Sequence, residues 1–227
     1  MNTLRLVQEQ GFAILPEVLL PREAQSLIDE LNRSTLRRTK AGVRHALKYP
    51  AVAALAQEPR LINIAREILG GEALPFHATL FDKSPQANWL VVWHQDTTLP
   101  LRERRDTPGW GPWSVKDGVT YAHAPASALC RVAALRIHLD DSTTHNGPLR
   151  VLPGTHMQGV LSDDDIQVLA TKKAPVDCLV PRGGVLAMKP LLIHASSKSQ
   201  MEMPRRVLHI EYSETAIVGT GLELAIA

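Results

Sequence analysis

Trp93-His94-Gln95-Asp96 is the stretch of this sequence from which the fold and its chemistry are predicted. It follows the apolar run Leu90-Val91-Val92, which is typical of a buried strand. Because side chains alternate between the two faces of a strand, His94 and Asp96 are predicted to share one face. An imidazole and a carboxylate on one face can bind the same divalent metal ion. A second histidine would complete the facial triad that is typical of non-haem Fe(II) oxygenases.

The third ligand has to come from the remaining histidines, and His194 is the best candidate. It ends the apolar run Leu191-Leu192-Ile193 and precedes Ala195-Ser196-Ser197, so it is predicted at a strand end with space beside it. His156, in contrast, lies in a predicted turn, where a histidine more often forms hydrogen bonds than binds metal. An isolated histidine such as His194 is usually structural, and the pair in the opening stretch is what favours a metal ligand here.

The composition limits the class of protein. At 227 residues the chain fits a single domain, residues 1–227. Its formal net charge of +2 is too balanced to favour nucleic acid or a membrane surface as a partner. Cys130 and Cys178 flank apolar strand-like residues outside any CxxC motif, so both are predicted to be buried, reduced thiols. No apolar signal region or membrane span is visible, so we expect a cytoplasmic protein.

The chain has two parts that differ in predicted secondary structure. Residues 1–73 are predicted as a helical N-terminal part that contains a short strand at 11–16 and helices from Pro21, at 51–56 and at 61–69. Residues 74–215 are predicted as the β core, because short strand-like runs are separated by Gly and Pro without intervening helices. The predicted strands are 75–82, 89–96, 130–139, 149–152, 177–180, 184–188, 191–195 and 205–213.

Residues 97–128 interrupt this pattern. The segment has no clear periodicity and contains Trp110 and Trp113. A long segment without regular structure in a compact domain is usually functional or disordered, and two tryptophans argue against disorder. Because the segment directly follows the His-Gln-Asp stretch, we predict a lid-like insertion over the mouth of the site, with Trp110 and Trp113 as candidate pocket residues.

The last predicted strand offers two arginines for an anionic co-substrate. Alternation puts Arg205 on one face with His209 and Glu211, and it puts Arg206 on the more apolar face. An arginine at the start of a strand can bind a carboxylate through two charge-assisted hydrogen bonds. Apolar content alone predicts that the Arg206 face is buried, so both arginines remain candidates at this point. The alternative that both arginines lie on the surface also remains open.

Taken together, these residues resemble the phytanoyl-CoA dioxygenase (PhyH-like) family of Fe(II)/2-oxoglutarate-dependent oxygenases over nearly the whole chain. An isolated His-x-Asp occurs often by chance, whereas the ordered set of motifs is specific. The sequence departs from the family pattern after the distal histidine, where it reads Ser197-Lys198-Ser199-Gln200. The motifs that carry the resemblance are Gly11-Phe12-Ala13-Ile14-Leu15-Pro16, Trp93-His94-Gln95-Asp96, Asn146-Gly147-Pro148-Leu149, Pro153-Gly154-Thr155-His156, His194-Ala195-Ser196 and Arg205.

The resemblance implies a mainly β fold with flanking helices, a double-stranded β-helix (a cupin-like jelly roll) with N-terminal helices packed on its outside. It also implies that His94, Asp96 and His194 bind Fe(II). It assigns the 5-carboxylate of 2-oxoglutarate to Arg205, with Ser196 as a helper. In such a fold the apolar face of the last strand can pack on the outer helices, which favours Arg205 over its neighbour.

In that family the middle strand lines the pocket, so Arg136 and His138 are candidate pocket residues. Arg136 either faces 2-oxoglutarate or the substrate, or it points outward and pairs with Asp140 or Asp141. A buried arginine needs an anionic partner, so the first alternative requires an anionic ligand beside Arg136.

The predicted function is a dioxygenase that uses Fe(II), 2-oxoglutarate and O2 to hydroxylate or otherwise oxidise a small molecule, releasing succinate and CO2. Asp96 favours hydroxylation, because related halogenases lack this carboxylate. Two alternatives are a non-oxygenase cupin-like metalloprotein and a catalytically inactive ligand-binding homologue. Basic residues suit an anionic substrate and equally a solvated surface; they are Arg37, Arg38, Lys40, Arg44, Arg102, Arg104 and Arg105.

Overall fold

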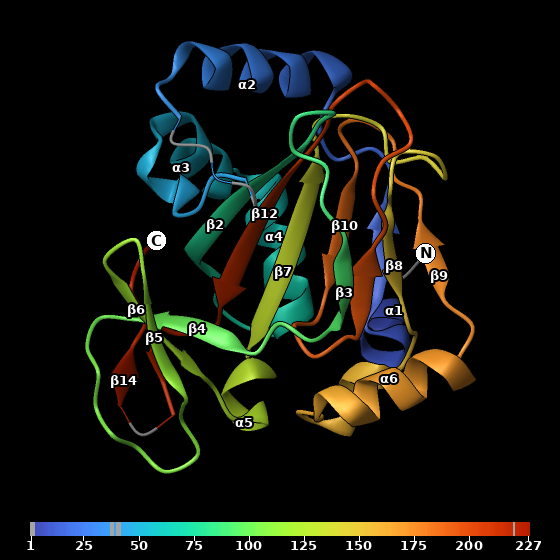
Figure 1. The fold of residues 1–227 in the computed structure, drawn as a ribbon. Coiled ribbons are helices and arrows are strands. Elements are labelled where there is room, and N and C mark those ends of the chain that lie inside the picture. The colour runs from blue at the N-terminus through green and yellow to red at the C-terminus, as the bar shows by residue number, and fades with distance from the viewer. Residues whose placement is uncertain (1–2, 37–38, 40–41, 220) are drawn as a thin grey trace.

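Two antiparallel sheets face each other at the centre of the protein (Figure 1). The structure, a computed structural model, describes residues 3–36, 39, 42–219 and 221–227. The larger sheet has the strand order β1-β10-β7-β12-β2, and the smaller sheet has the order β3-β11-β8-β9. Their bounds are β1 Phe12–Leu15, β2 Leu74–Lys83, β3 Val91–His94, β7 Val132–His138, β8 Leu149–Val151, β9 Val176–Cys178, β10 Val185–Met188, β11 His194–Ser196 and β12 Arg205–Ser213. This arrangement is the predicted jelly roll.

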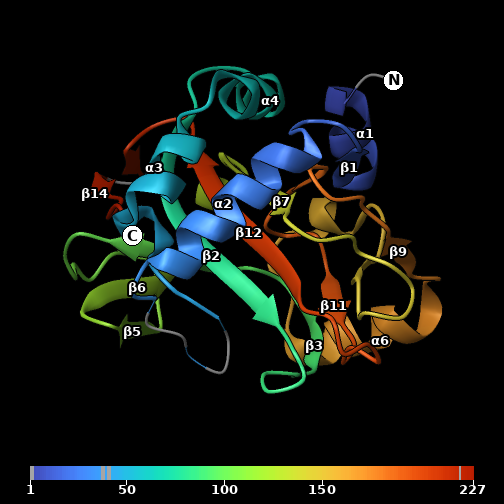
Figure 2. The same cartoon turned by 90° about the horizontal axis from the view of Figure 1, so that it is seen from above.

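Helices cover the outer face of the larger sheet (Figures 1 and 2). Proline occupies the first turn of three of them, where its missing N–H leaves no hydrogen bond unmade. Apolar residues of these helices form one core cluster with Leu208, Ile210 and Tyr212, which share one face of β12. The opposite face of β12 therefore points between the two sheets. The helices are α1 Thr3–Gln10, α2 Pro21–Arg33, the 3₁₀ helix η1 Ala46–Lys48, α3 Pro50–Ala56 and α4 Pro59–Leu69.

Residues 97–128 form a small sheet of their own, so the expectation of a segment without regular structure was wrong. The strands β4 (Thr98–Leu101), β5 (Trp113–Lys116) and β6 (Val119–His123) pair in the order β4-β6-β5, and helix α5 (Ala126–Leu129) follows. Strands of four or five residues carry too few alternations for a periodic signal. The short strands β13 (Ile217–Val218) and β14 (Leu222–Glu223) pack against this segment through a shared apolar cluster.

Three further expectations differ from the structure. The predicted strand 191–195 begins only at His194, because a turn closed by Leu192 N–H and Lys189 O precedes it. Helix α6 (Asp163–Lys172) was not predicted, although Ser162 caps it and three aspartates occupy its first turn. The remaining 3₁₀ helix is η2, Thr155–Gln158. Cys178 is buried as expected, but Cys130 is exposed. Among the described residues, no helix combines the length and the apolar character that a bilayer crossing needs.

Gly183 holds the connection between β1 and α2 against the larger sheet through a close contact with Leu19. Its carbonyl accepts a hydrogen bond of 2.8 Å from Leu19 N–H, and a Cβ added to it would overlap the carbonyl oxygen of Leu19. Gly118, in the β5–β6 turn, has the same φ of +83° but open space around it.

We expect Gly118→Ala to lower the free energy of unfolding by about 1–2 kcal/mol, the cost of a left-handed backbone. Gly183→Ala should lower it by a further 1–3 kcal/mol or so, because the methyl group has no room. Urea denaturation of both variants measures the difference, and equal losses would contradict the close docking at Gly183.

Candidate metal centre and its pocket

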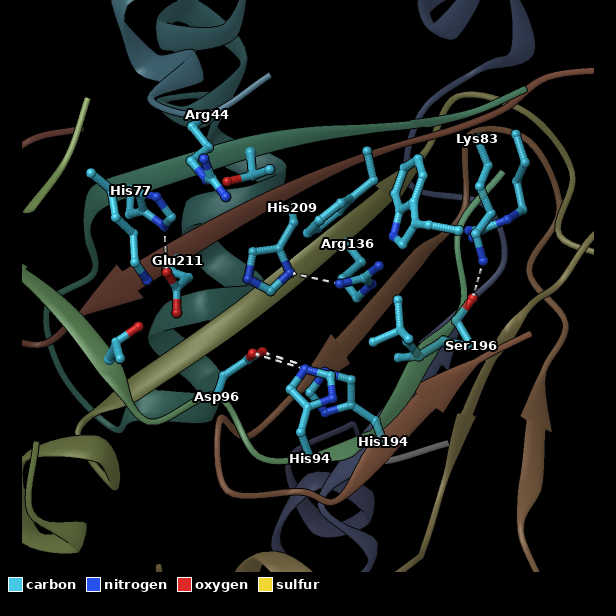
Figure 3. A pocket seen from close by; sticks show the side chains of 18 of the residues that line it. Arg44, His77, Lys83, His94, Asp96, Arg136, His194, Ser196, His209 and Glu211 are labelled. Carbon is cyan, nitrogen blue, oxygen red and sulfur yellow. Dashed lines mark hydrogen bonds and ion pairs between the residues drawn. The ribbon is translucent and has the colours of Figure 1, made fainter. Parts of the chain in front are cut away.

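Three potential metal ligands converge between the ends of β3 and β11 (Figure 3). His94 is the last residue of β3, His194 is the first residue of β11, and the two are paired across the strands. Asp96 lies just beyond β3, where its N–H donates to Pro190 O at 3.0 Å. Its two carboxylate oxygens lie 3.5 Å from His94 Nε2 and 3.6 Å from His194 Nε2. The three side chains share one site, although β3 ends before Asp96.

Backbone hydrogen bonds fix the orientation of both imidazole rings. Nδ1 of His94 lies 2.9 Å from Val92 O, and Nδ1 of His194 lies 2.9 Å from Leu192 O. Because only an N–H can bond to a carbonyl oxygen, each Nδ1 carries the hydrogen and each Nε2 presents its lone pair to the common centre. Neighbouring ligands of one ion with bonds of about 2.1 Å lie about 3 Å apart, so these donors suit a small divalent cation.

Charge in the cluster is arranged for metal binding. Burial works against ionisation of Asp96, but the two histidines outweigh it and hold the pKa of this carboxyl well below its usual range. Burial lowers the pKa of His194 to about 4 against the opposing effect of Asp96. At His94 burial also lowers the pKa, but the hydrogen bond and charge of Asp96 outweigh it, so the pKa is raised. His94 therefore carries a second ring proton in mildly acidic solution, which a metal ion has to displace.

Gln95 points away from the site, as strand alternation predicts, and it has a structural role that the sequence did not show. Its side-chain NH2 group donates to Leu191 O at 2.8 Å and to Gly159 O at 2.9 Å. Its oxygen accepts from Leu161 N–H at 2.9 Å. These bonds tie the end of β3 to the loop after η2 and to the turn before β11, so they hold both histidines in place.

The pocket above the cluster has a volume of about 200 Å³ and a cationic inner end. Arg205 is only 4% exposed, and its Nε donates to Asn146 O at 3.1 Å. Lys83 donates to Ser196 Oγ at 2.7 Å and to Ser197 O. Burial, with Arg205 and Arg136 nearby, lowers the pKa of Lys83 to about 7. None of these cations forms an ion pair with a described carboxylate, so this end of the pocket suits an anion.

Arg206 lies on the outer face of β12 and takes no part in the pocket. Its Nε and Nη2 donate to the Asp140 carboxylate at 2.7 and 2.8 Å. Since Asp140 is already paired with Arg206, it does not serve Arg136, which instead lines the pocket. The alternation predicted for this strand is confirmed, and of its two arginines only Arg205 faces the metal side.

A chain of polar side chains forms the opposite end of the pocket. Glu211 Oε2 lies 2.6 Å from His77 Nδ1, His77 Nε2 lies 3.2 Å from Tyr121 Oη, and Tyr121 Oη lies 2.9 Å from His45 Nε2. The basic side chains of Arg44 and Lys116 line the same pocket. Sequence reasoning missed this chain. Its only visible signal was the polar face that Glu211 shares with Arg205.

The two tryptophans proposed for the pocket lie elsewhere. Trp110 is buried in the second apolar cluster, and Trp113 packs against that cluster, because the small sheet needs a core of its own. The segment reaches the pocket through Thr98, Lys116 and Tyr121 instead.

Two further histidines considered in the sequence, His138 and His156, do not line the pocket. His138 is buried and lies outside the pocket lining, and neither of its ring nitrogens has a hydrogen-bond partner among the described residues. His156 Nε2 lies 3.1 Å from Gln8 O, which is the hydrogen-bonding role expected for it. Trp89 lines the pocket and was not predicted.

Metal affinity should depend on a single proton in mildly acidic solution. As the pH is lowered from about 6.5 to 5, we expect the affinity for Mn(II) to fall about tenfold per pH unit, because the ion must displace the proton of His94. His194 adds no second proton there, since burial keeps its pKa at about 4. Electron paramagnetic resonance of free Mn(II) measures this slope. A slope of two protons, or none, would contradict the protonation of the cluster.

Comparisons with known proteins agree with this geometry. The family description "Phytanoyl-CoA dioxygenase (PhyH)" matches residues 7–207. Ectoine dioxygenase of Halomonas elongata is 27% identical over 165 residues, which are 66% of this chain and 43% of that protein. L-proline trans-4-hydroxylase of Streptomyces griseoviridis is 26% identical over 187 residues, 71% of this chain and 62% of that protein. The chain thus spans less than two thirds of the length of these two relatives.

Solved structures show the same fold. AviO1 from Streptomyces viridochromogenes Tue57 superimposes with a TM-score of 0.71 at 23% identity, covering 96% of both chains. EctD from S. alaskensis, solved with 2-oxoglutarate and 5-hydroxyectoine, gives a TM-score of 0.69 at 20% identity, covering 92% of this chain and 74% of that one. With the family match extending over most of its length, the chain belongs to the phytanoyl-CoA dioxygenase (PhyH) family.

Proposed function

We propose that this protein is a dioxygenase that uses Fe(II), 2-oxoglutarate and O2 to hydroxylate or otherwise oxidise a small molecule, with release of succinate and CO2. The convergence of His94, Asp96 and His194 at one end of a pocket with buried arginines carries the proposal. Relatives named ectoine dioxygenase and L-proline trans-4-hydroxylase support a small-molecule substrate.

The donor set fits Fe(II). Two imidazoles and one carboxylate would hold the ion through His94, His194 and Asp96 and would leave its other positions for small ligands. Iron and 2-oxoglutarate together supply the oxidising chemistry when bound. The protein contributes rings that are oriented before binding, a carboxylate that stays ionised, and a pocket between two sheets that limits water. Asp96 would fill the position that is free for a halide in related halogenases, which favours hydroxylation.

Arg205 is the proposed partner of the 5-carboxylate of 2-oxoglutarate. It is buried, faces the metal side and has no carboxylate partner among the described residues. Ser196 Oγ donates to Gly147 O at 2.9 Å and accepts from Lys83. The serine can therefore help to bind the co-substrate only after it releases Gly147 O, whereas the Lys83 ammonium group has a further hydrogen to donate.

The substrate is proposed to be a small polar molecule with an anionic group. Lys116 and Arg44 line the pocket on the side of Glu211 and can attract such a group, although Arg44 also lies 4.0 Å from the Asp117 carboxylate. The remaining basic residues give less support. Arg102 pairs with Glu223 and Arg104 with Asp106. Arg37, Arg38 and Lys40 lie outside the described residues.

Anaerobic addition of Fe(II) and 2-oxoglutarate tests the function directly. We expect a visible metal-to-ligand charge-transfer band, followed by succinate formation when O2 is admitted. His94→Ala should abolish both signals, because it removes an iron ligand. Bound metal without a band or succinate would favour a non-oxygenase cupin-like metalloprotein. A band without succinate would favour an inactive ligand-binding homologue.

Adjacent arginines provide a matched pair for the co-substrate site. Arg205→Gln should weaken 2-oxoglutarate binding by about 10- to 150-fold, the value of a charge-assisted interaction of about 1.5–3 kcal/mol. Arg206→Gln, one residue away, should leave binding unchanged, because Arg206 faces Asp140 on the outside. Titration of the charge-transfer band gives both affinities. The reverse pattern would assign the co-substrate to Arg206.

Segment 97–128 is proposed to act as a lid that becomes better ordered when ligands bind, through Thr98, Lys116 and Tyr121 at the pocket. Limited proteolysis within 97–128 should then be slower with Fe(II) and 2-oxoglutarate bound, and slowest with substrate. Equal rates in the free and the ligand-bound protein would exclude the lid.

A further inference from the structure

Arg136 is a buried cation without a described anionic partner. Its side chain is only 6% exposed and lines the pocket. Nη1 donates to His209 Nδ1 at 3.0 Å, and Cζ lies 5.0 Å from the centre of the Phe81 ring. Nε has no hydrogen-bond partner in the part of the chain that the structure describes. Burying a guanidinium group without an anion is costly, so this position is arranged for an anion that binds.

His209 holds the guanidinium in place without neutralising it. Burial, followed by the charge of Arg136, lowers the pKa of His209 to about 3. The ring is therefore neutral at physiological pH, and its Nδ1 accepts a hydrogen bond from Arg136. A neutral acceptor orients the guanidinium and leaves its positive charge available to a ligand.

Sheet register separates Arg136 from Arg205 along the pocket. Arg136 on β7 is paired directly with His209 on β12. Arg205 lies four residues before His209 on the same strand and on the same face. Four residues of a strand span about 13 Å. The two arginines therefore enter the pocket at different positions along β12.

Arg136 lies between the metal cluster and Lys83, which is the cross-strand partner of Arg205. Figure 3 shows Arg136 between His194 and Asp96 on one side and Lys83 and Ser196 on the other. The charge pattern agrees. Burial lowers the pKa of Arg136, and Asp96 is the main group that opposes this effect. At Arg205 the corresponding effects come from burial, Arg136 and Asp140, with no contribution from a metal ligand.

We propose that Arg136 binds the C1 carboxylate of 2-oxoglutarate, at the metal end, while Arg205 binds the 5-carboxylate at the far end. The dicarboxylate is then held by one guanidinium at each end, and Lys83 lies beside the far one. This inference rests on the proposed function and extends it to a second co-substrate residue. It also explains why a buried arginine occupies this position on β7 without a protein carboxylate.

Two 2-oxo acids separate the roles of the two arginines. 2-Oxopentanoate has the chain length and the C1 carboxylate of 2-oxoglutarate but lacks the 5-carboxylate. The affinity of each acid is measured from the charge-transfer band in anaerobic titrations of the Fe(II) protein. The wild type should prefer 2-oxoglutarate. Arg205→Gln should lose that preference. Arg136→Gln should weaken both acids by the same factor, about tenfold or more, and keep the preference.

Two controls distinguish a specific loss of 2-oxo acid binding from a folding defect. Arg136→Lys retains a cation at the same place and should recover part of the lost affinity for both acids. Fe(II) affinity without any 2-oxo acid should be similar in all variants, which shows that the metal cluster is intact.

The inference is overturned if Arg136→Gln leaves both affinities within about twofold of the wild type, since a C1 partner would have affected both. It is also overturned if Arg136→Gln, rather than Arg205→Gln, removes the preference for 2-oxoglutarate. A wild-type protein that gives no band with either acid would be a different outcome, because it would contradict the proposed function itself.

Discussion

The pairing of His94 with His194 across β3 and β11 is the interaction on which the site depends. It brings together two residues far apart in the sequence, and each ring is then fixed by a hydrogen bond from Nδ1 to a carbonyl of its own chain segment. With both Nε2 atoms facing Asp96, little movement of the side chains is needed to bind a metal ion. Gln95 reinforces the arrangement from behind through its three hydrogen bonds to neighbouring loops.

Strand alternation in β12 determines how the rest of the pocket is built. Leu208, Ile210 and Tyr212 pack beneath the N-terminal helices. Arg205, His209 and Glu211, on the other face, therefore point toward the smaller sheet. The register with β2 places Lys83 opposite Arg205 and His77 opposite Glu211. One strand pair thus gives the pocket a cationic end and an end that contains a buried carboxylate. Arg136 on β7 adds a second guanidinium on the metal side.

Local patterns were enough to predict a β core and to select candidate metal ligands, whereas the jelly roll followed from the family resemblance. His94 and Asp96 are close in sequence, and the alternation around Arg205 is visible without a structure. Lys83 and Glu211 could not be assigned, because their place depends on how β2 pairs with β12, which no local pattern encodes. The small sheet of residues 97–128 was missed because its short strands give no periodic signal. Trp110 was expected in the pocket, but it instead fills the core that this sheet requires.

A crystal structure of the protein with Mn(II) and 2-oxoglutarate, grown without oxygen, tests the central claim most directly. We expect Mn(II) bonded to His94 Nε2, an Asp96 carboxylate oxygen and His194 Nε2 at about 2.0–2.2 Å. The 5-carboxylate should lie on Arg205 and the C1 carboxylate beside Arg136. Metal bound at other residues, or 2-oxoglutarate bound with Arg205 and Arg136 both left without a carboxylate, would contradict it.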